Sequence, residues 1–343
     1  MTARDGTARD GRVMAAWRTR WGRRWRAWAA LCNQREAALA LALFRIAVGT
    51  VLAGTLLSVV FEGTVEALWV DAAHGGIFPS PRRTVLVDLL GGPTPPVVWG
   101  LVWTAVAAAF CTAVGAFGRL SPLVAVQAYA ALYPTSINAS SDWLIANGLW
   151  LLVLADATAT LSVDAKLRHG RFVRDDVTVM AWPRYLAIFQ LVCVYAFAGF
   201  EKIGEGWTFA EGYTAIYNVL QRPDRARFEL GFLPSLYPVT QAMTFVSVYW
   251  EMSAPLLLLF YYYRATPARG GRLRSFVLRH DVRLWFLAFG VLFHLGIAAT
   301  LHVGPFSYIA LSFYFCFLHP DELRALWRRA LRRFPNAPHG ATG

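Results

Sequence analysis

The sequence predicts an all-α protein: a polytopic bundle of about eight membrane-spanning helices, preceded by an amphipathic helix at the membrane surface. Hydrophobic residues make up 57% of the 343-residue chain and charged residues only 16%, whereas a soluble chain carries about a quarter charged residues. The charges lie mostly between long apolar segments, as expected where lipid solvates most side chains. Many of the 14 tryptophans stand at the ends of these segments, where Trp anchors a helix to the headgroup layer.

Eight apolar segments are candidates for crossing the membrane core, which requires about 20 residues in a helix. In chain order they are Ala38–Phe61, Val97–Phe117, Leu120–Tyr133, Trp143–Leu161, Trp182–Phe200, Val239–Tyr262, Leu284–His302 and Phe306–Leu318. The third and the eighth are short, a length that suits a tilted, re-entrant or buried helix.

Basic segments between these helices predict the orientation of the chain. Arginine and lysine collect before the first span, between the second and third, and after the fourth, sixth and eighth. Placing these five segments on the cytoplasmic side gives eight spans with both termini inside. The less basic loops then face outward, at about 62–96, 134–142, 201–238 and 303–305. Within the third of these loops, Arg222, Arg225 and Arg227 are a local exception to the charge bias.

Residues 14–33 are the predicted surface helix. Trp17, Trp21, Trp25 and Trp28 recur at helical spacing with arginines between them. This pattern is typical of a basic amphipathic helix on anionic lipid. A helix that docks a partner protein is the alternative interpretation.

We expect three regions: a basic cytoplasmic segment at 1–36, a transmembrane domain at 37–325, and a basic, partly disordered cytoplasmic tail at 326–343. The net charge of +12 is also found in nucleic-acid-binding proteins. Here the basic residues stand where membrane orientation requires them, so no nucleic-acid partner is expected. The four cysteines form no C-x-x-C pair, and we expect neither a structural disulfide nor a metal site.

Ionisable residues inside or beside the apolar segments are the first candidates for function, because such a side chain is costly unless it is paired or hydrated. They are Arg45, Asp142, Glu201, Lys202, Glu251, His294 and His302. In the eight-span topology Asp142, Lys202 and His302 lie at a similar depth near the outer face. The sequence cannot say whether they touch.

Each candidate also has a purely structural interpretation. Arg45 can join helices through backbone carbonyls or a carboxylate, and Glu251 can be its partner. His294 can be a hydrogen-bonded interhelical histidine, and Asp142 can cap the fourth helix. Lys202 can extend outward as an ordinary interfacial anchor.

Two motifs carry a resemblance to a known family. Val194–Trp207 reads VYAFAGFEKIGEGW and resembles the V-Y-F-x-A-G-x-x-K-L-x-x-x-W signature of vitamin K-dependent gamma-glutamyl carboxylases and their bacterial relatives, the HTTM family. Phe293 and His294, followed by Gly304–Tyr308, are similar to that family's F-H … G-x-F-S-Y stretch. Weaker likenesses in matching order are Leu43–Ile46, Gly75–Pro79 and Asp156–Asp164. The resemblance covers roughly residues 38–325.

The resemblance implies acid–base chemistry at Lys202, because the lysine of this signature deprotonates vitamin K hydroquinone in the carboxylases. Oxygen then adds, the quinone becomes an epoxide, and the strong base so formed removes a glutamate gamma proton, after which carbon dioxide traps the carbanion. The expected cofactor is therefore vitamin K hydroquinone or menaquinol, used with O2 and CO2. Loss of hydration at a helix end beside lipid favours the neutral amine that a base requires.

With this resemblance, roles can be assigned to the candidates. We expect Lys202, His294 and Asp142 to be catalytic, and Trp207, Tyr195, His302, Glu251 and Arg45 to contact the cofactor. The sequence also departs from the carboxylases. Glu201 replaces a second lysine, and a neighbouring carboxylate would hold Lys202 protonated. The large extracytoplasmic domain that binds the substrate propeptide in the animal enzyme has no counterpart here, so that mode of substrate recognition is not expected.

Three functions remain open from the sequence. The first is a carboxylase-like membrane enzyme that uses a quinol. The second is a factor for the maturation or export of a secreted peptide, similar to the SdpB proteins, and the third is a non-catalytic scaffold or transporter. The expected partners are the lipid bilayer and, for the first two, a secreted peptide or protein. The expected location is the bacterial cytoplasmic membrane.

Overall fold

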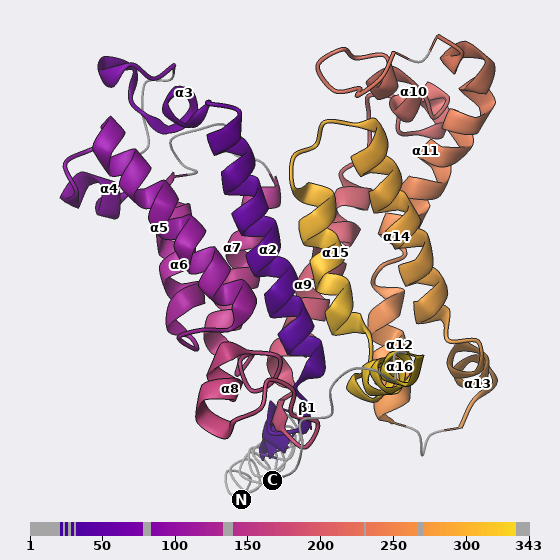
Figure 1. Cartoon of the computed structure of the whole chain (residues 1–343). Helices are drawn as coiled ribbons and strands as arrows, with labels where there is room; N and C mark the ends of the chain where they lie inside the picture. Colours follow the sequence, from indigo (N-terminus) through magenta and orange to yellow (C-terminus); the bar gives the residue numbers. More distant parts are fainter. Residues whose placement is uncertain are drawn as a thin grey trace, which may run out of the picture.

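The computed structural model describes residues 21–22, 25–26, 29–30, 32–77, 84–132, 140–229, 231–266 and 270–333 (Figure 1). Over these residues the chain is a helical bundle with one small two-stranded sheet, so the predicted all-α class is confirmed. Strand β1 (Arg35–Ala37) pairs antiparallel with β2 (Thr178–Met180). The sheet joins the segments that lead into two of the long apolar helices.

Four apolar helices form the N-terminal helix group: α2 (Leu39–Phe61), α5 (Pro95–Val114), α6 (Leu120–Leu132) and α7 (Ser140–Leu154). Each packs against the next one along the chain, and α7 also contacts α2. Four short helices lie in the connections: α3 (Val65–Trp69), η1 (Ala72–His74), α4 (Val85–Leu89) and α8 (Val163–His169). Local sequence sets the ends of α5, which begins at a proline and stops at Gly115 in the left-handed conformation.

Five apolar helices form the C-terminal helix group: α9 (Trp182–Phe200), α11 (Tyr237–Met252), α12 (Leu256–Ala265), α14 (Val282–Thr300) and α15 (Phe306–Phe317). Shorter or more polar helices accompany them: η3 (Phe209–Glu211), α10 (Ala215–Leu220), η4 (Leu233–Leu236), α13 (Arg272–Arg279) and α16 (Pro320–Arg333). Helix α15 contacts α2, α7 and α9, and so joins the two groups.

Each of the eight predicted apolar segments contains at least one helix, and these helices differ in length. Helices α2, α5, α9 and α14 are each long and apolar enough to cross a membrane. Helices α11 and α12, with the preceding η4, satisfy the same test together as one span with a 43° bend. Helices α6, α7 and α15 are shorter apolar helices. The structure therefore supports a membrane protein, and the count of eight spans stays a prediction.

Two predicted segments end or break earlier than the apolar pattern indicated. The fourth was expected to continue to Leu161, but α7 ends at Leu154, and the residues that follow form a loop around the side chain of Arg45. The sixth breaks between α11 and α12, where Pro255 lacks the N–H that a continuous helix would use. Apolar composition alone could not reveal either feature.

The two ends of the bundle differ in character (Figure 1). Strand β1 and helices α8, α13 and α16 lie at one end, whereas α3, α4 and α10 lie at the other. We call these the basic end and the α10 end. The basic segments that follow the fourth, sixth and eighth apolar segments thus share one end, as the charge bias predicts. Of the predicted surface helix, residues 21–22, 25–26 and 29–30 are helical, and Trp21 and Trp25 are exposed. Trp17 and Trp28 lie outside the described residues.

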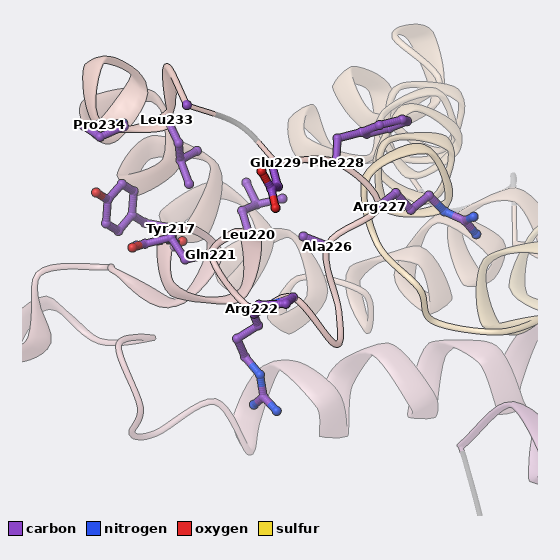
Figure 2. A pocket seen from close by; sticks show the side chains of 12 residues that line it. Tyr217, Leu220, Gln221, Arg222, Ala226, Arg227, Phe228, Glu229, Leu233 and Pro234 are labelled. Carbon is purple, nitrogen blue, oxygen red and sulfur yellow. Dashed lines mark hydrogen bonds between the residues drawn. The ribbon is translucent and has the colours of Figure 1, made fainter.

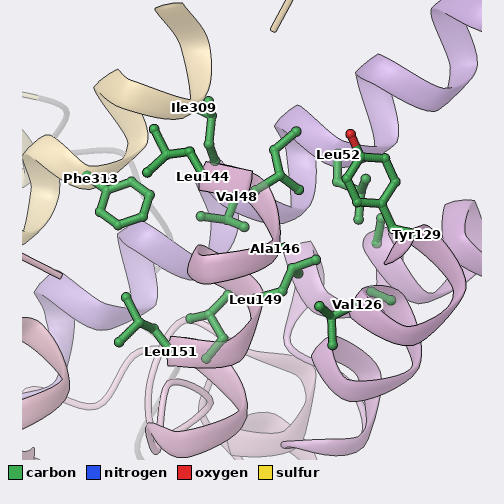
Figure 3. Packing of buried hydrophobic residues seen from close by; sticks show 14 of the residues in the cluster. Val48, Leu52, Val126, Tyr129, Leu144, Ala146, Leu149, Leu151, Ile309 and Phe313 are labelled. Atoms are coloured by element: carbon green, nitrogen blue, oxygen red, sulfur yellow. The ribbon is translucent and has the colours of Figure 1, made fainter. Parts of the chain in front are cut away.

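Close packing between the helix groups depends on small residues and aromatic rings. A Cβ on Gly49 of α2 would lie 2.6 Å from the backbone nitrogen of Ala113 on α5, so the glycine lets the two backbones approach. Phe44 of α2 meets Phe313 of α15 edge to face, with ring centroids 4.9 Å apart. Figure 3 shows Phe313 beside the aliphatic side chains of α7 in this core.

Two buried arginines fasten the basic end. Arg184 donates to both carboxylate oxygens of Glu36, at 2.6 and 2.8 Å, and to the carbonyl of Cys316. Arg283 donates to Glu322 of α16 at 2.9 Å, and also to Asp281. These contacts tie the N-terminal segment and α16 to the C-terminal helix group.

Candidate functional site

Lys202 forms an ion pair with Glu251, and this pair is the centre of the candidate site. Lys202 follows the end of α9, while Glu251 lies near the end of α11. Only 17% of the lysine side chain and 8% of the glutamate side chain are exposed. Lys202 therefore turns inward to a carboxylate instead of extending into water as a free anchor.

Gly199 allows this pair to form. A Cβ at this position would lie 2.7 Å from the backbone nitrogen of Met252, a distance that real Cβ contacts do not reach. Without a side chain, α9 approaches α11 directly beside Glu251. The glycine of the A-G-x-x-K motif thus has a packing role: it brings the lysine, three residues later in the motif, within reach of Glu251.

Trp207 covers the other side of the lysine. The ammonium lies 4.6 Å from the centroid of the indole ring, a cation–π geometry. The turn that carries Trp207 is held by Gly206, whose φ of +87° favours glycine. Its N–H donates to Glu211 Oε2 at 2.8 Å, and Gln241 of α11 donates to the Gly212 carbonyl at 2.6 Å. The loop is therefore fixed to α11, the helix that supplies Glu251.

A second polar group, deeper in the bundle, joins three helices. The hydroxyl of Tyr195 on α9 lies 2.7 Å from Nε2 of His294 on α14 and 2.9 Å from the hydroxyl of Tyr314 on α15. All three side chains are buried. Among the described residues, His294 Nδ1 and the Ser307 hydroxyl are buried without a hydrogen-bond partner.

Trp250 connects the two polar groups. Its ring lies 4.9 Å from that of Tyr195 and 4.7 Å from that of Phe286, and the next residue in α11 is Glu251. The Lys202–Glu251 pair and the Tyr195–His294–Tyr314 chain are thus neighbours in one aromatic environment.

Large apolar side chains are exposed around Lys202. Their exposed fractions are 65% for Phe197, 54% for Phe200, 80% for Ile203, 85% for Phe209 and 49% for Tyr249. In water such a group of side chains would be an aggregation hazard, whereas lipid accepts it readily. The surface next to the ion pair is therefore suited to contact with the bilayer.

Three of the predicted site residues have other partners. Asp142, at the start of α7, accepts a hydrogen bond of 2.6 Å from Tyr129 of α6. The backbone N–H of His302 donates to the Arg225 carbonyl at 2.6 Å. Arg45 donates to the carbonyls of Ala157 and Leu161 and to two carbonyls near the end of α5.

The proposed pairing of Glu251 with Arg45 was wrong. Arg45 is fully engaged by backbone carbonyls next to α8, at the basic end, while Glu251 faces Lys202. Likewise, the carboxylate that pairs with Lys202 is Glu251 and not its sequence neighbour Glu201, whose side chain is exposed. Sequence proximity favoured Glu201, but helix packing selects a residue 49 positions away.

Tyr314 and Trp250 were not among the residues that the sequence pattern identified. Each lies in an aromatic-rich apolar segment, where one more ring carries no distinct signal. The sequence signal that pointed to this region was Glu251, since a carboxylate inside an apolar segment needs a cation or hydrogen-bond donors nearby.

A separate hollow of about 540 Å³ lies in the loop between α10 and η4 (Figure 2). Figure 2 shows Arg222 and Arg227 directed away from it. Arg222 pairs with Asp224 at 2.8 Å, and Arg227 donates to the Leu301 carbonyl. Arg225 also lies 3.5 Å from Asp224, so each of the three arginines that were an exception to the charge bias of this loop has a local partner. Elsewhere in the described chain, no group of three His, Cys, Asp or Glu side chains is placed to hold a metal ion.

Comparison with protein families matches residues 33–268 to the HTTM domain. This match covers more than half of the chain and includes the Val194–Trp207 motif. It ends before Phe293 and Gly304–Tyr308, so the second motif lies outside it. Comparisons with curated proteins and with solved structures returned no match. Together with the apolar helices and the position of the first motif, the family match shows that this chain is an integral membrane protein of the HTTM domain family.

Proposed function

We propose that this HTTM-family protein removes a proton from the hydroxyl of a lipid-soluble quinol at the Lys202–Glu251 pair. The observation that carries the proposal is the position of the pair: part-buried at the end of α9, beneath Trp207 and beside exposed apolar side chains. Ionisable residues inside a membrane bundle cost free energy even when they are paired, so their presence there indicates a functional site. Perturbed or paired ionisable groups of this kind are typical of functional sites.

The residues around the pair fit a quinol by their chemistry. A quinol has a flat ring with hydroxyl groups and an isoprenoid tail. Trp207 offers an aromatic face next to the ammonium, while Phe200, Ile203 and Phe209 offer apolar surface for the tail. Vitamin K hydroquinone and menaquinol both satisfy this description.

The ion pair can accept a proton and still keep its cation. Lys202 Nζ passes a proton to Glu251 Oε2 and takes the proton of the quinol hydroxyl in return. The pair ends as an ammonium and a carboxylic acid, with the positive charge beside the oxygen that lost its proton. Such a charge stabilises a developing anion strongly where water is scarce. Glu251 thus removes the difficulty that a permanently protonated lysine would have as a base.

The quinol would supply the reducing electrons for a reaction with O2. As in the carboxylases that the Val194–Trp207 motif resembles, the base so produced would remove a glutamate gamma proton and CO2 would add to the carbanion. This later step is supported by the motif and by the family match that includes it. We further propose that the glutamate belongs to a secreted peptide or protein.

The test is epoxide formation by the purified protein in lipid nanodiscs supplied with vitamin K hydroquinone and O2. We expect wild type to form the epoxide, and Lys202→Ala and Glu251→Gln to lose most of this activity. The chain has one other lysine, Lys166, whose ammonium binds the Gly170 carbonyl at the basic end, so Lys166→Ala is the matched control. Equal epoxide from wild type and Lys202→Ala would overturn the assignment.

A second measurement separates the two steps. Labelled CO2 is added together with a glutamate-containing peptide, and incorporation into the peptide is followed. Epoxide without incorporation would retain the proton-transfer proposal and refute carboxylation. If the wild type neither forms the epoxide nor oxidises menaquinol, the proton-transfer and carboxylation steps are both refuted. That result would favour a role in maturation, export or scaffolding.

A further inference from the structure

Helix α13 is fastened to the bundle by one face. Arg274 is buried, and its guanidinium donates to the carbonyl of Tyr263 at 3.0 Å and to the hydroxyl of Thr266 at 2.9 Å. The same group lies 4.6 Å from the centroid of the Tyr263 ring. These contacts fix the rotation of α13 against the end of α12.

The opposite face of α13 is open. At 3.6 residues per turn, Arg272, Phe276 and Arg279 point away from Arg274, and Ser275 lies at the edge of that face. Together with Gly271 and His280 they line a hollow of about 540 Å³. The His280 ring packs 4.6 Å from Phe276 and borders the same face. The hollow thus combines two guanidinium groups and a hydroxyl with an aromatic side.

We infer that this face of α13 binds the phosphate-bearing headgroup of an anionic phospholipid. Arg272 and Arg279 lie about two helical turns apart, and their long side chains can both reach one phosphate, with the Ser275 hydroxyl between them. Within the described residues, the ion pairs found at this end involve other arginines, so these two charges are not neutralised by a carboxylate. An anion is the ligand that this charge distribution favours.

Exposed apolar residues on α13 identify the source of the phosphate as lipid. Leu273 is 60% exposed and Phe276 57% exposed, and both adjoin the arginines on the helix surface. A free phosphate would leave these side chains in water, whereas a phospholipid in the adjacent leaflet would cover them with its acyl chains. Helix α13 also lies at the basic end, where the chain passes from one apolar helix to the next. It is therefore positioned at a membrane surface.

The site is tested by native mass spectrometry of the delipidated full-length protein with added phosphatidylglycerol or phosphatidylcholine. We expect retention of phosphatidylglycerol over phosphatidylcholine, and a loss of about tenfold in Arg272→Gln/Arg279→Gln. The matched control is Arg119→Gln/Arg171→Gln, which removes the same charge from two exposed residues elsewhere. Arg119 directly precedes α6, and Arg171 follows α8. This control should retain phosphatidylglycerol as the wild type does.

Three outcomes would overturn the inference. An equal loss in the control would show that only the total charge matters. Displacement of phosphatidylglycerol by millimolar inorganic phosphate would show that the acyl chains contribute nothing. The variant Arg272→Glu/Arg279→Glu reverses both charges, so retention of phosphatidylglycerol at the wild-type level would mean that the two arginines do not hold the headgroup.

Discussion

Glu251 of α11 and Lys202 at the end of α9 form a hydrogen-bonded ion pair, although they are 49 residues apart in the sequence. The pair lies where a lysine would otherwise be free to reach water, and the ammonium lies over the ring of Trp207. Its geometry depends on the close approach of α9 and α11 at Gly199. A site for proton transfer is therefore built by the packing of two helices and one loop.

Breaking this pair should cost more stability than removing it entirely. Lys202→Ala leaves Glu251 charged and largely buried, and removal of one partner of a buried pair costs about 3–5 kcal/mol. The partial exposure of the lysine places the expected loss at the lower end of that range. Lys202→Met/Glu251→Leu should recover much of it. Thermal unfolding in nanodiscs measures both, with Lys166→Ala as control, and a double variant no more stable than the single one would contradict the pairing.

Tyr195→Phe should destabilise the bundle more than Tyr314→Phe. The Tyr195 hydroxyl serves both His294 and Tyr314, so its loss leaves two buried polar groups without this partner. A buried unsatisfied group costs about 1–3 kcal/mol. Tyr308→Phe, at an exposed position on α15, is the control and should have little effect. Equal melting temperatures for all three variants would show that the hydrogen-bonded chain contributes nothing to stability.

Arg45→Lys should destabilise the basic end although it keeps the charge. The planar guanidinium reaches carbonyls of the α5 end and of the 157–161 loop at the same time. An ammonium on a flexible stem cannot reproduce this fork, and several carbonyls would lose their donor. We expect a loss of about 2 kcal/mol or more, measured by unfolding. The exposed Arg168→Lys is the control.

Gly49→Ala and Gly54→Ala should have opposite effects, although both residues lie in α2. A methyl group at position 49 would overlap the backbone of Ala113, whereas nothing lies within 4 Å of a Cβ at position 54. Overpacking costs about 1–3 kcal/mol, while Gly to Ala in an open helical position gains up to about 1 kcal/mol. The melting temperature should therefore fall in Gly49→Ala and rise slightly in Gly54→Ala. Similar values for the two variants would mean that α2 and α5 are not in contact at Gly49.

Acid should weaken the attachment of α16. Burial alone would raise the pKa of Glu322, but hydrogen bonds from Arg283 and from the backbone of His319 outweigh it and lower the pKa from 4.5 to about 2. Because the folded pKa lies below the unfolded value, the stabilisation is complete above pH 4.5 and is lost as the pH falls toward 2. The melting temperature should fall over this interval.

The control for this pH effect is Glu322→Gln, which cannot titrate. Its melting temperature should be lower at pH 7 and should lack the decline between pH 4.5 and 2. Burial also lowers the pKa of His319, so a decline that begins below pH 6.5 should persist in the variant. A wild-type curve that matches the variant over the acidic interval would refute the role of Glu322.

Much of the fold could be predicted from the sequence because a lipid environment strongly constrains which residues a membrane protein places where. Long apolar segments must be helical, since no water is present to satisfy backbone groups, and basic residues collect on one side. Each of the eight apolar segments indeed contains at least one helix, and the basic segments after three of them share one end. The lengths were less readable, because Pro255 and the loop around Arg45 interrupt segments whose composition stays apolar.

The sequence predicted most residues of the candidate site but not their partners. An ionisable residue in an apolar segment stands out by itself, so Lys202, Glu251 and His294 were evident, and the motif pointed to Trp207 and Tyr195. The partners of these residues were not evident: the structural alternative for Glu251 was a pairing with Arg45, whereas the residue pairs with Lys202. Tyr314 was missed altogether, because one more aromatic residue in an aromatic segment gives no signal.

The sequence by itself determined that this chain is a helical membrane protein, where its apolar helices lie, and that Lys202 belongs to an HTTM-type motif. These are properties of hydrophobicity, charge and short patterns, which act locally along the chain. Only the tertiary structure decided that Lys202 meets Glu251, that Tyr195 links His294 to Tyr314, and that Arg45 binds carbonyls. Such partners are chosen by how closely and at what rotation helices pack, and single features such as the missing side chain at Gly199 decide that geometry.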